Sequence, residues 1–186
     1  MRSMAPVRRF AAYDPVQRTL HWLMAALIFV ALALGLWARE LPRGEFRSNV
    51  LWFHKPVGMT ILALLLFRIV WRLAKGAPAY VEPLGRMTQA AAHSAHMALY
   101  ALMLAMPVSG YLLSSAGGNA VSWFGLFTIP DIVPRSRELA EASREAHYVL
   151  AWTIGVVVAL HLAAVVWHAG VKRDTVLTRM WPSYRP

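Results

Sequence analysis

Two histidines in one apolar stretch of this sequence have a spacing that suits metal chemistry. His147 and His161 are 14 residues apart. On an α-helix this spacing separates them by roughly 21 Å and returns both side chains to almost the same face after nearly four turns. Imidazole is the commonest side-chain metal ligand in proteins. We therefore expect one helix that contributes a ligand to each of two metal centres.

The stretch that contains these histidines is long enough to cross a membrane. Residues 146–171 lack Asp, Glu, Lys and Arg, and so do residues 19–38. Crossing the hydrocarbon core takes about 20 apolar residues. An ionisable side chain in such a span usually faces the bundle interior and has a functional partner. The alternative is an imidazole that only hydrogen-bonds a neighbouring helix, and the recurrence of histidine in several spans argues against it.

The composition is that of an integral membrane protein. Hydrophobic residues make up 58% of the 186 residues, charged residues make up 15%, and the mean hydropathy is +0.46. An ordinary soluble domain of this length is less apolar. We expect an all-α fold in which residues 1–186 form a single domain, an up-down bundle of four transmembrane helices. The expected spans are about 17–38, 52–73, 93–116 and 147–170.

The first apolar run is expected to be a retained helix. Arg8 and Arg9 precede it, as in a secretion signal, but the run is too long for that and three further spans follow. Asp14 supplies an N-cap and Pro15 suits the first helical turn. This helix is therefore predicted to begin just before the membrane surface.

The net charge of +10 does not indicate nucleic-acid binding, because the basic residues flank apolar spans. If the amino terminus is cytoplasmic, 11 of the 19 Lys and Arg residues fall on that side, seven fall on the other and Arg68 lies in the second span. This distribution follows the positive-inside rule. We expect a multi-pass protein of the bacterial inner membrane with both termini in the cytoplasm.

The absence of cysteine limits the chemistry that any metal can do here. A chain with no Cys has no covalently attached c-type haem, no cysteine-ligated iron–sulfur cluster, no disulfide and no catalytic thiol. Histidine must therefore carry the metal.

The depths of four histidines predict two pairs. In an up-down bundle, His21 opens the first helix on the cytoplasmic side, and His161 lies deep in the fourth helix towards the same side. His54 and His147 open the second and fourth helices on the opposite side. Each pair would supply the two axial imidazoles of a b-type haem. Zinc and copper sites gather three or four ligands in one place, so they fit these separated pairs less well.

Further polar residues are candidates for the surroundings of the haems. Five basic side chains are candidates to bind haem propionates, with contact to lipid headgroups as the alternative: Arg18, Lys55, Arg68, Arg72 and Arg144. His93 and His96 are expected to open the third helix on the cytoplasmic side. They are interpreted as supporting or structural residues. The alternatives are that one of them competes with His21 for the inner haem or that they line a quinone or proton path.

The combined pattern of these residues resembles the bacterial cytochrome b561 family over nearly the whole chain. The features that carry the resemblance are His21-Trp22, His54 with Gly58, Arg68 to Arg72, His93-x-x-His96 with Tyr100, Pro107-Val108-x-Gly110, Trp123-Phe124-Gly125-Leu126 before Pro130, and His147 with His161. The resemblance implies a four-helix, di-haem, quinone-linked electron carrier of the inner membrane. Its expected cofactors are two haem b groups.

One branch of that family is a superoxide oxidase, which passes the electron of periplasmic superoxide through both haems to ubiquinone. In that branch the haem ligands match His21, His54, His147 and His161, and the histidine that matches His168 is implicated in quinone chemistry. His168 also suits this role physically, because it lies two turns beyond His161, where an imidazole can hydrogen-bond a quinone and relay protons. An interfacial histidine that merely reaches water is the alternative.

The resemblance thus predicts an oxidoreductase that transfers electrons from superoxide to ubiquinone. The expected partners are the lipid bilayer, ubiquinone, and superoxide or another electron donor, with a homodimer as one candidate assembly and no role for nucleic acid. One alternative is an electron-transfer cytochrome b subunit of another quinone-linked dehydrogenase or reductase. A more remote one is a small metal transporter that uses its histidines as stepping sites.

Overall fold

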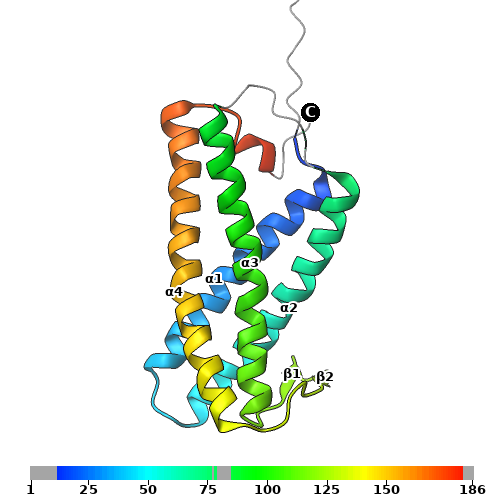
Figure 1. Ribbon diagram of the computed structural model, residues 1–186, viewed down its shortest axis with the longest axis vertical. Coiled ribbons are helices and arrows are strands. Elements are labelled where there is room, and N and C mark those ends of the chain that lie inside the picture. Colours follow the sequence, from blue (N-terminus) through cyan, green and yellow to red (C-terminus); the bar gives the residue numbers. More distant parts are fainter. Residues whose placement is uncertain (1–11, 77, 79–84, 182–186) are drawn as a thin grey trace, which may run out of the picture.

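The computed structural model describes residues 12–76, 78 and 85–181. Four long helices dominate this part of the chain: α1 (Pro15–Glu40), α2 (Glu45–Lys75), α3 (Arg86–Ala116) and α4 (Arg137–Trp167). They run up and down in turn (Figure 1), with α1 packed along α2, α2 along α3 and α3 along α4. All four are long and apolar enough to cross a membrane. The predicted all-α, four-helix membrane bundle is therefore confirmed.

The helices extend beyond the apolar spans predicted from the sequence. Helix α2 begins at Glu45, α3 at Arg86 and α4 at Arg137, whereas the apolar spans were expected to begin near 52, 93 and 147. The added turns are polar, so hydropathy did not mark them, although their backbone continues the helix. The expectation that histidines open these helices was wrong, since His54 and His147 lie nine and ten residues inside them. His93 and His96 likewise lie seven and ten residues inside α3.

The start of α1 is capped as the sequence predicts. The Asp14 carboxylate accepts hydrogen bonds from the backbone N–H of Val16 (3.0 Å) and of Gln17 (3.1 Å), and from the indole of Trp71 (3.1 Å). Partial burial raises the pKa of Asp14, but these hydrogen bonds outweigh it and hold the pKa below its usual value. Because Trp71 belongs to α2, the same cap also joins the first two helices.

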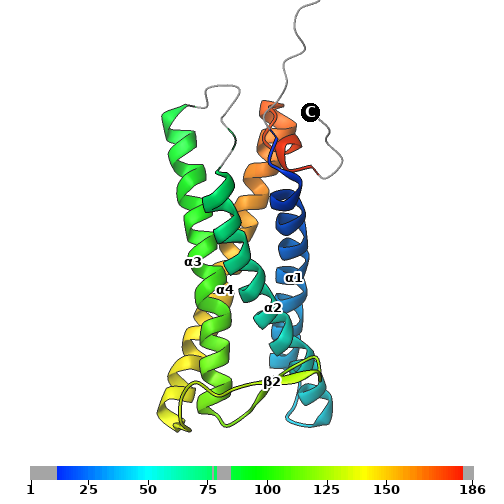
Figure 2. The same ribbon diagram turned by 90° about the vertical axis from the view of Figure 1, so that its right-hand side faces the viewer.

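A short β-hairpin lies between α3 and α4 and was not expected from the sequence. Strands β1 (Val121–Trp123) and β2 (Phe127–Ile129) pair antiparallel, and Phe124 and Gly125 turn between them with φ of +51° and +79°. The indole of Trp123 donates to the Thr60 hydroxyl of α2 at 3.1 Å. The hairpin therefore closes one end of the bundle over α2 (Figure 2), and we call this the hairpin end.

The other end, where α1 begins and α4 finishes, is closed by the C-terminal segment. Helix α4 runs into a π-helix, η1 (His168–Lys172), and a 3₁₀ helix, η2 (Thr178–Met180), follows. The indole of Trp22 in α1 donates to the Met180 carbonyl at 2.8 Å, and the N–H of Tyr13 donates to the Arg179 carbonyl at 3.2 Å. The segment thus folds back onto the start of α1 (Figure 1). We call this the terminal end.

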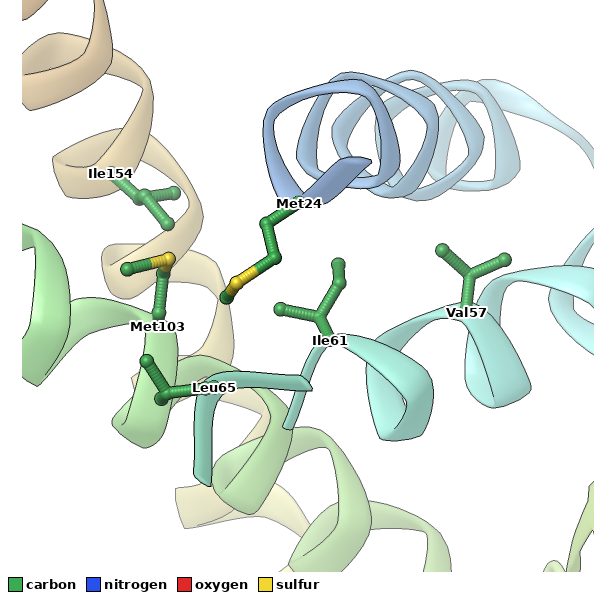
Figure 3. Packing of buried hydrophobic residues seen from close by; sticks show 6 residues of the cluster. All are labelled: Met24, Val57, Ile61, Leu65, Met103 and Ile154. Carbon is green, nitrogen blue, oxygen red and sulfur yellow. The ribbon is translucent and has the colours of Figure 1, made fainter. Parts of the chain in front are cut away.

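Side chains from all four helices form an apolar cluster inside the bundle (Figure 3): Met24, Val57, Ile61, Leu65, Met103 and Ile154. Met24 follows His21 by three residues and Val57 follows His54 by three, while Ile154 is seven residues from both His147 and His161. The cluster therefore lies between the two predicted levels of histidine.

Replacing Leu65 with Ala should create a cavity in this cluster, because the Leu65 side chain is fully buried. We expect the free energy of unfolding to fall by about 2–4 kcal/mol, measured as a lower thermal midpoint in detergent. Leu73→Ala on the same helix is the control, since Leu73 is 81% exposed, and its midpoint should stay near that of the wild type. Equal midpoints for the two variants would contradict the assigned packing.

Candidate metal centres

His54 of α2 and His147 of α4 face each other near the hairpin end. Their ring centres are 6.1 Å apart and the ring planes are nearly perpendicular, at 89°. A bond of about 2 Å from an imidazole nitrogen to a metal on each side, plus roughly 1 Å from each nitrogen to its ring centre, gives a separation of about 6 Å. The pair therefore has the separation needed to hold one ion between the two rings.

Hydrogen bonds fix which nitrogen of each ring faces a metal. The Nδ1 atom of His54 lies 3.0 Å from the Ala31 carbonyl of α1, and that of His147 lies 3.0 Å from the Met106 carbonyl of α3. A carbonyl oxygen only accepts, so Nδ1 carries the proton in both rings. Each Nε2 then keeps its lone pair for a metal. The Ser109 hydroxyl also bonds Nδ1 of His147 at 3.0 Å.

The same local arrangement recurs on α1 and α3. Each of these two rings packs against a glycine that lies four residues after the carbonyl it bonds. A Cβ atom on Gly35 would lie 3.0 Å from Cε1 of His54, and one on Gly110 would lie 2.8 Å from Cε1 of His147. Glycine at these two positions therefore lets an imidazole approach the helix closely enough to reach its backbone.

Three imidazoles gather towards the terminal end. The His21 ring of α1 lies 6.3 Å from the His161 ring of α4, centre to centre, which also suits one metal between them. The His96 ring of α3 lies 5.8 Å from that of His161. Within the described residues, none of these three rings has a hydrogen bond to a backbone carbonyl. The ring distances alone therefore allow either His21 or His96 to share a metal with His161.

A buried arginine lies close to these rings. Arg68 of α2 is 8% exposed, and its guanidinium donates to the Tyr100 hydroxyl of α3 and to the Gln17 carbonyl of α1, both at 3.2 Å. Its positive charge is near enough to act electrostatically on both His21 and His96. Arg68 is therefore a fixed cation at the terminal-end centre.

The remaining basic candidates are more scattered. Arg18 is buried and donates to the Trp181 carbonyl at 3.0 Å, and the Arg72 guanidinium lies 5.8 Å from the Tyr13 ring. Lys55 is half-buried beside His54, whereas Arg144 is exposed on α4. Arg68 and Arg72 both lie near enough to act electrostatically on His96 at the terminal end, whereas Arg144 lies on the surface.

His93 and His168 lie outside the paired rings. His93 is exposed on α3. His168 begins η1 directly after α4, and its Nδ1 atom pairs with the Asp174 carboxylate. Sequence reasoning missed Asp174 because it follows the last apolar span. A signal for the hairpin-end pair is present in the sequence, because Ala31-x-x-x-Gly35 and Met106-x-x-x-Gly110 both mark carbonyls that an imidazole reaches.

The donor set favours a flat macrocyclic metal complex over a bare ion. Among the described residues, no three His, Asp or Glu side chains gather closely enough to hold a metal ion by themselves. Facing imidazoles at two levels of a helical bundle instead suit two haems, each held from both sides. Fold and site together define a membrane cytochrome.

The chain belongs to the prokaryotic cytochrome b561 family, whose sequence model matches residues 12–183. This confirms the family resemblance. Members of this family bind haem b, generally two haems, and transfer electrons in bacterial membranes. The chain is therefore a multi-pass membrane protein of electron transfer.

Three relatives match across most of the chain. Cytochrome b561 homolog 2 of Escherichia coli is 31% identical over 169 residues, which cover 90% of each chain. A probable superoxide oxidase, CybB, of Yersinia pestis is 28% identical over 93% of this chain and 97% of its own length. Cytochrome b561 homolog 1 of Escherichia coli is 27% identical over 91% of this chain and 97% of its own.

Gly110→Ala should displace the His147 ring, because the added methyl group would lie 2.8 Å from Cε1. We expect haem binding at the hairpin end to weaken roughly tenfold or more, as when the orientation of a ligating imidazole is disturbed. Haem content per chain, with reduced-minus-oxidised spectra, measures this. Gly170→Ala is the control, since no atom lies within 4 Å of the added carbon. A Gly110→Ala protein with full haem content would contradict the close approach.

Proposed function

We propose that the protein is a di-haem b-type cytochrome in which His54 and His147 ligate one iron and His21 and His161 ligate the other. The observation that carries this proposal is the pair of facing imidazoles at each of two levels, 6.1 and 6.3 Å apart. At the hairpin end, the hydrogen bonds at Nδ1 leave both Nε2 lone pairs for the metal. His96 is assigned a supporting place beside His161.

Each haem, when bound, supplies a one-electron redox centre at its iron. The chain's own residues hold the two centres at fixed levels, and the apolar cluster around Leu65 keeps water out of the space between them. Arg68 is the foremost candidate to bind a propionate, because it is buried beside the terminal-end rings. Arg18, Lys55 and Arg72 are further candidates, and His93 is placed at the margin of a quinone or proton path.

The proposed orientation places the terminal end in the cytoplasm. The excess of Lys and Arg on that side supports it. The hairpin end would then face the periplasm, where Arg39, Arg43, Arg47 and Lys55 outnumber Glu40 and Glu45 over residues 39–55. This local excess of positive charge would attract small anions. The Arg39 guanidinium lies 4.0 Å from the Tyr148 ring.

The proposed reaction is electron transfer from periplasmic superoxide to ubiquinone. Similarity to the probable superoxide oxidase of Yersinia pestis supports the donor. The position of His168 at the terminal end supports quinone chemistry, because an imidazole there can protonate a quinone oxygen. The alternative is a cytochrome b subunit that relays electrons for another quinone-linked dehydrogenase or reductase. Similarity to the two relatives that are named only as cytochrome b561 homologues is equally consistent with that alternative.

His147→Ala tests the ligand pairs. The variant should lose the hairpin-end haem and keep the other, so haem per chain in a pyridine haemochrome assay should fall from two to one. His93→Ala is the control, because His93 is exposed and outside both pairs, and it should retain both haems. Unchanged haem content in the His147 variant would overturn the assigned pairing, and a wild-type protein without haem would favour a metal-transport role.

Mixing the purified protein alone with superoxide and ubiquinone tests the reaction. We expect haem reduction by superoxide, followed by formation of ubiquinol without any further protein. His168→Ala should slow ubiquinol formation by about a hundredfold, the scale of a lost proton donor, while haem reduction by superoxide stays at the wild-type rate. A protein with both haems that superoxide fails to reduce would leave the relay subunit as the better assignment.

A further inference from the structure

The chain reverses direction after α4 and η1, and this reversal brings the Asp174 carboxylate next to the His168 side chain. Arg173 adopts a left-handed conformation, with φ of +52°, directly after η1. The backbone N–H of Asp174 then donates to the His168 carbonyl at 3.2 Å. The turn places residue 174 beside the side chain of residue 168 instead of further along the helix.

The two side chains form a hydrogen bond that is shielded from solvent. Nδ1 of His168 bonds Oδ2 of Asp174, and both side chains are about one-sixth exposed, at 17% and 16%. The other carboxylate oxygen, Oδ1, accepts the N–H of Val176 at 3.1 Å. Both oxygens of Asp174 are thus engaged, and the carboxylate is held in one orientation.

The segment that carries Asp174 is itself anchored. Trp22 and Arg18 of α1 donate to the carbonyls of Met180 and Trp181, at 2.8 and 3.0 Å. The rings of Trp22 and Trp181 also meet edge to face, with centres 5.9 Å apart. Because Trp22 follows His21 directly, the carboxylate is tied to the helix that carries the terminal-end histidine.

His168 is placed on the same helix face as His161. Seven residues of α-helix separate the two, which corresponds to roughly 10 Å along the axis and nearly two whole turns. A ligand that bonds His168 therefore lies beside the terminal-end centre, close enough to it for electron transfer.

We propose that Asp174 is a positioning residue that holds the Nδ1–H of His168, so that Nε2 of His168 delivers protons to a quinone at the terminal end. A carboxylate on Nδ1 fixes the tautomer and the orientation of the ring. This inference rests on the proposed quinone reduction and adds to it the residue that orients the proton donor.

The proton balance follows from this arrangement. When a quinone bound beside His168 takes up one electron, the Nε2–H bond of His168 would break and an O–H bond would form at the quinone oxygen that it faces. His168 is left neutral, with its proton on Nδ1 bonded to Asp174, and water at the membrane surface returns a proton to Nε2. A second electron and a second proton, which the opposite quinone oxygen takes from water at the membrane surface, complete the quinol, and Asp174 keeps its charge throughout.

Asp174→Asn is the decisive variant, because Asn keeps the size of the side chain and removes its charge. Protein with both haems is reduced with dithionite and mixed with ubiquinone-1, and haem reoxidation is followed by stopped flow. We expect reoxidation at saturating quinone to slow roughly ten- to a hundredfold. Asp174→Glu should recover part of the rate. Reduction of the haems by superoxide should be unchanged in both variants.

Asp14→Asn is the matched control. Asp14 is a carboxylate at the same end of the bundle that contacts Val16, Gln17 and Trp71, and Asn caps a helix as well as Asp does. Its reoxidation rate should equal that of the wild type. A slow Asp14 variant would show that loss of charge at this end, and not the dyad, controls the rate.

A spectroscopic measurement tests the dyad without turnover. In protein labelled with ¹⁵N-histidine, the carboxylate-bound Nδ1 proton of His168 should give a far-downfield resonance that disappears in Asp174→Asn. Its absence from the wild type would overturn the dyad.

The outcomes also separate this inference from the proposed function. Wild-type haems that ubiquinone-1 fails to reoxidise would overturn both. A rapid wild type with an equally rapid Asp174→Asn variant would overturn only the role of Asp174, and so would equal slowing by the Asn and Glu variants, because that result assigns Asp174 to packing.

Discussion

The arrangement of the hairpin end depends on one interaction, the hydrogen bond from an imidazole Nδ1 to a backbone carbonyl of the neighbouring helix. A polar ring in an apolar bundle is costly unless its hydrogen-bonding groups are paired. The Ala31 and Met106 carbonyls satisfy one nitrogen of His54 and of His147 at 3.0 Å, and the facing nitrogens are left to a metal. The rings can reach these carbonyls only because the next turn of each helix carries a glycine.

The need to pair each Nδ1 with a carbonyl also determines which helices the hydrogen bonds join. His54 of α2 bonds α1, and His147 of α4 bonds α3, so the hydrogen bonds join the helices that are consecutive in sequence. The contact between the rings joins α2 to α4 across the bundle. The two hydrogen bonds and the facing rings thus involve all four helices at one level. The hairpin covers that level, with Trp123 bonded to Thr60 of α2, so the loop between α3 and α4 has a structural role at this end.

The sequence was sufficient for the number of helices and for the juxtaposition of His21 with His161 and of His54 with His147, since charge-free runs and a spacing of 14 residues depend only on helix geometry. Helix ends were less predictable, because the polar first turns of α2 and α4 continue the helix outside the apolar spans. The hairpin and the contact between His168 and Asp174 were missed, because both depend on left-handed residues in connecting segments. No hydrophobic period marks such turns.

The two ends of the bundle differ in a way that gives the proposed electron transfer a direction. At the hairpin end, each ring bonds a neutral carbonyl, and the half-buried Lys55 follows His54. The terminal-end rings lie near the guanidinium of Arg68, which is more deeply buried. A fixed positive charge in a medium of low dielectric constant favours the form of a redox centre that carries the extra electron. In the proposed arrangement, this charge would raise the reduction potential of a haem held at the terminal end more than Lys55 would raise that of a haem at the hairpin end. Electrons that enter at the hairpin end would then move downhill towards His168.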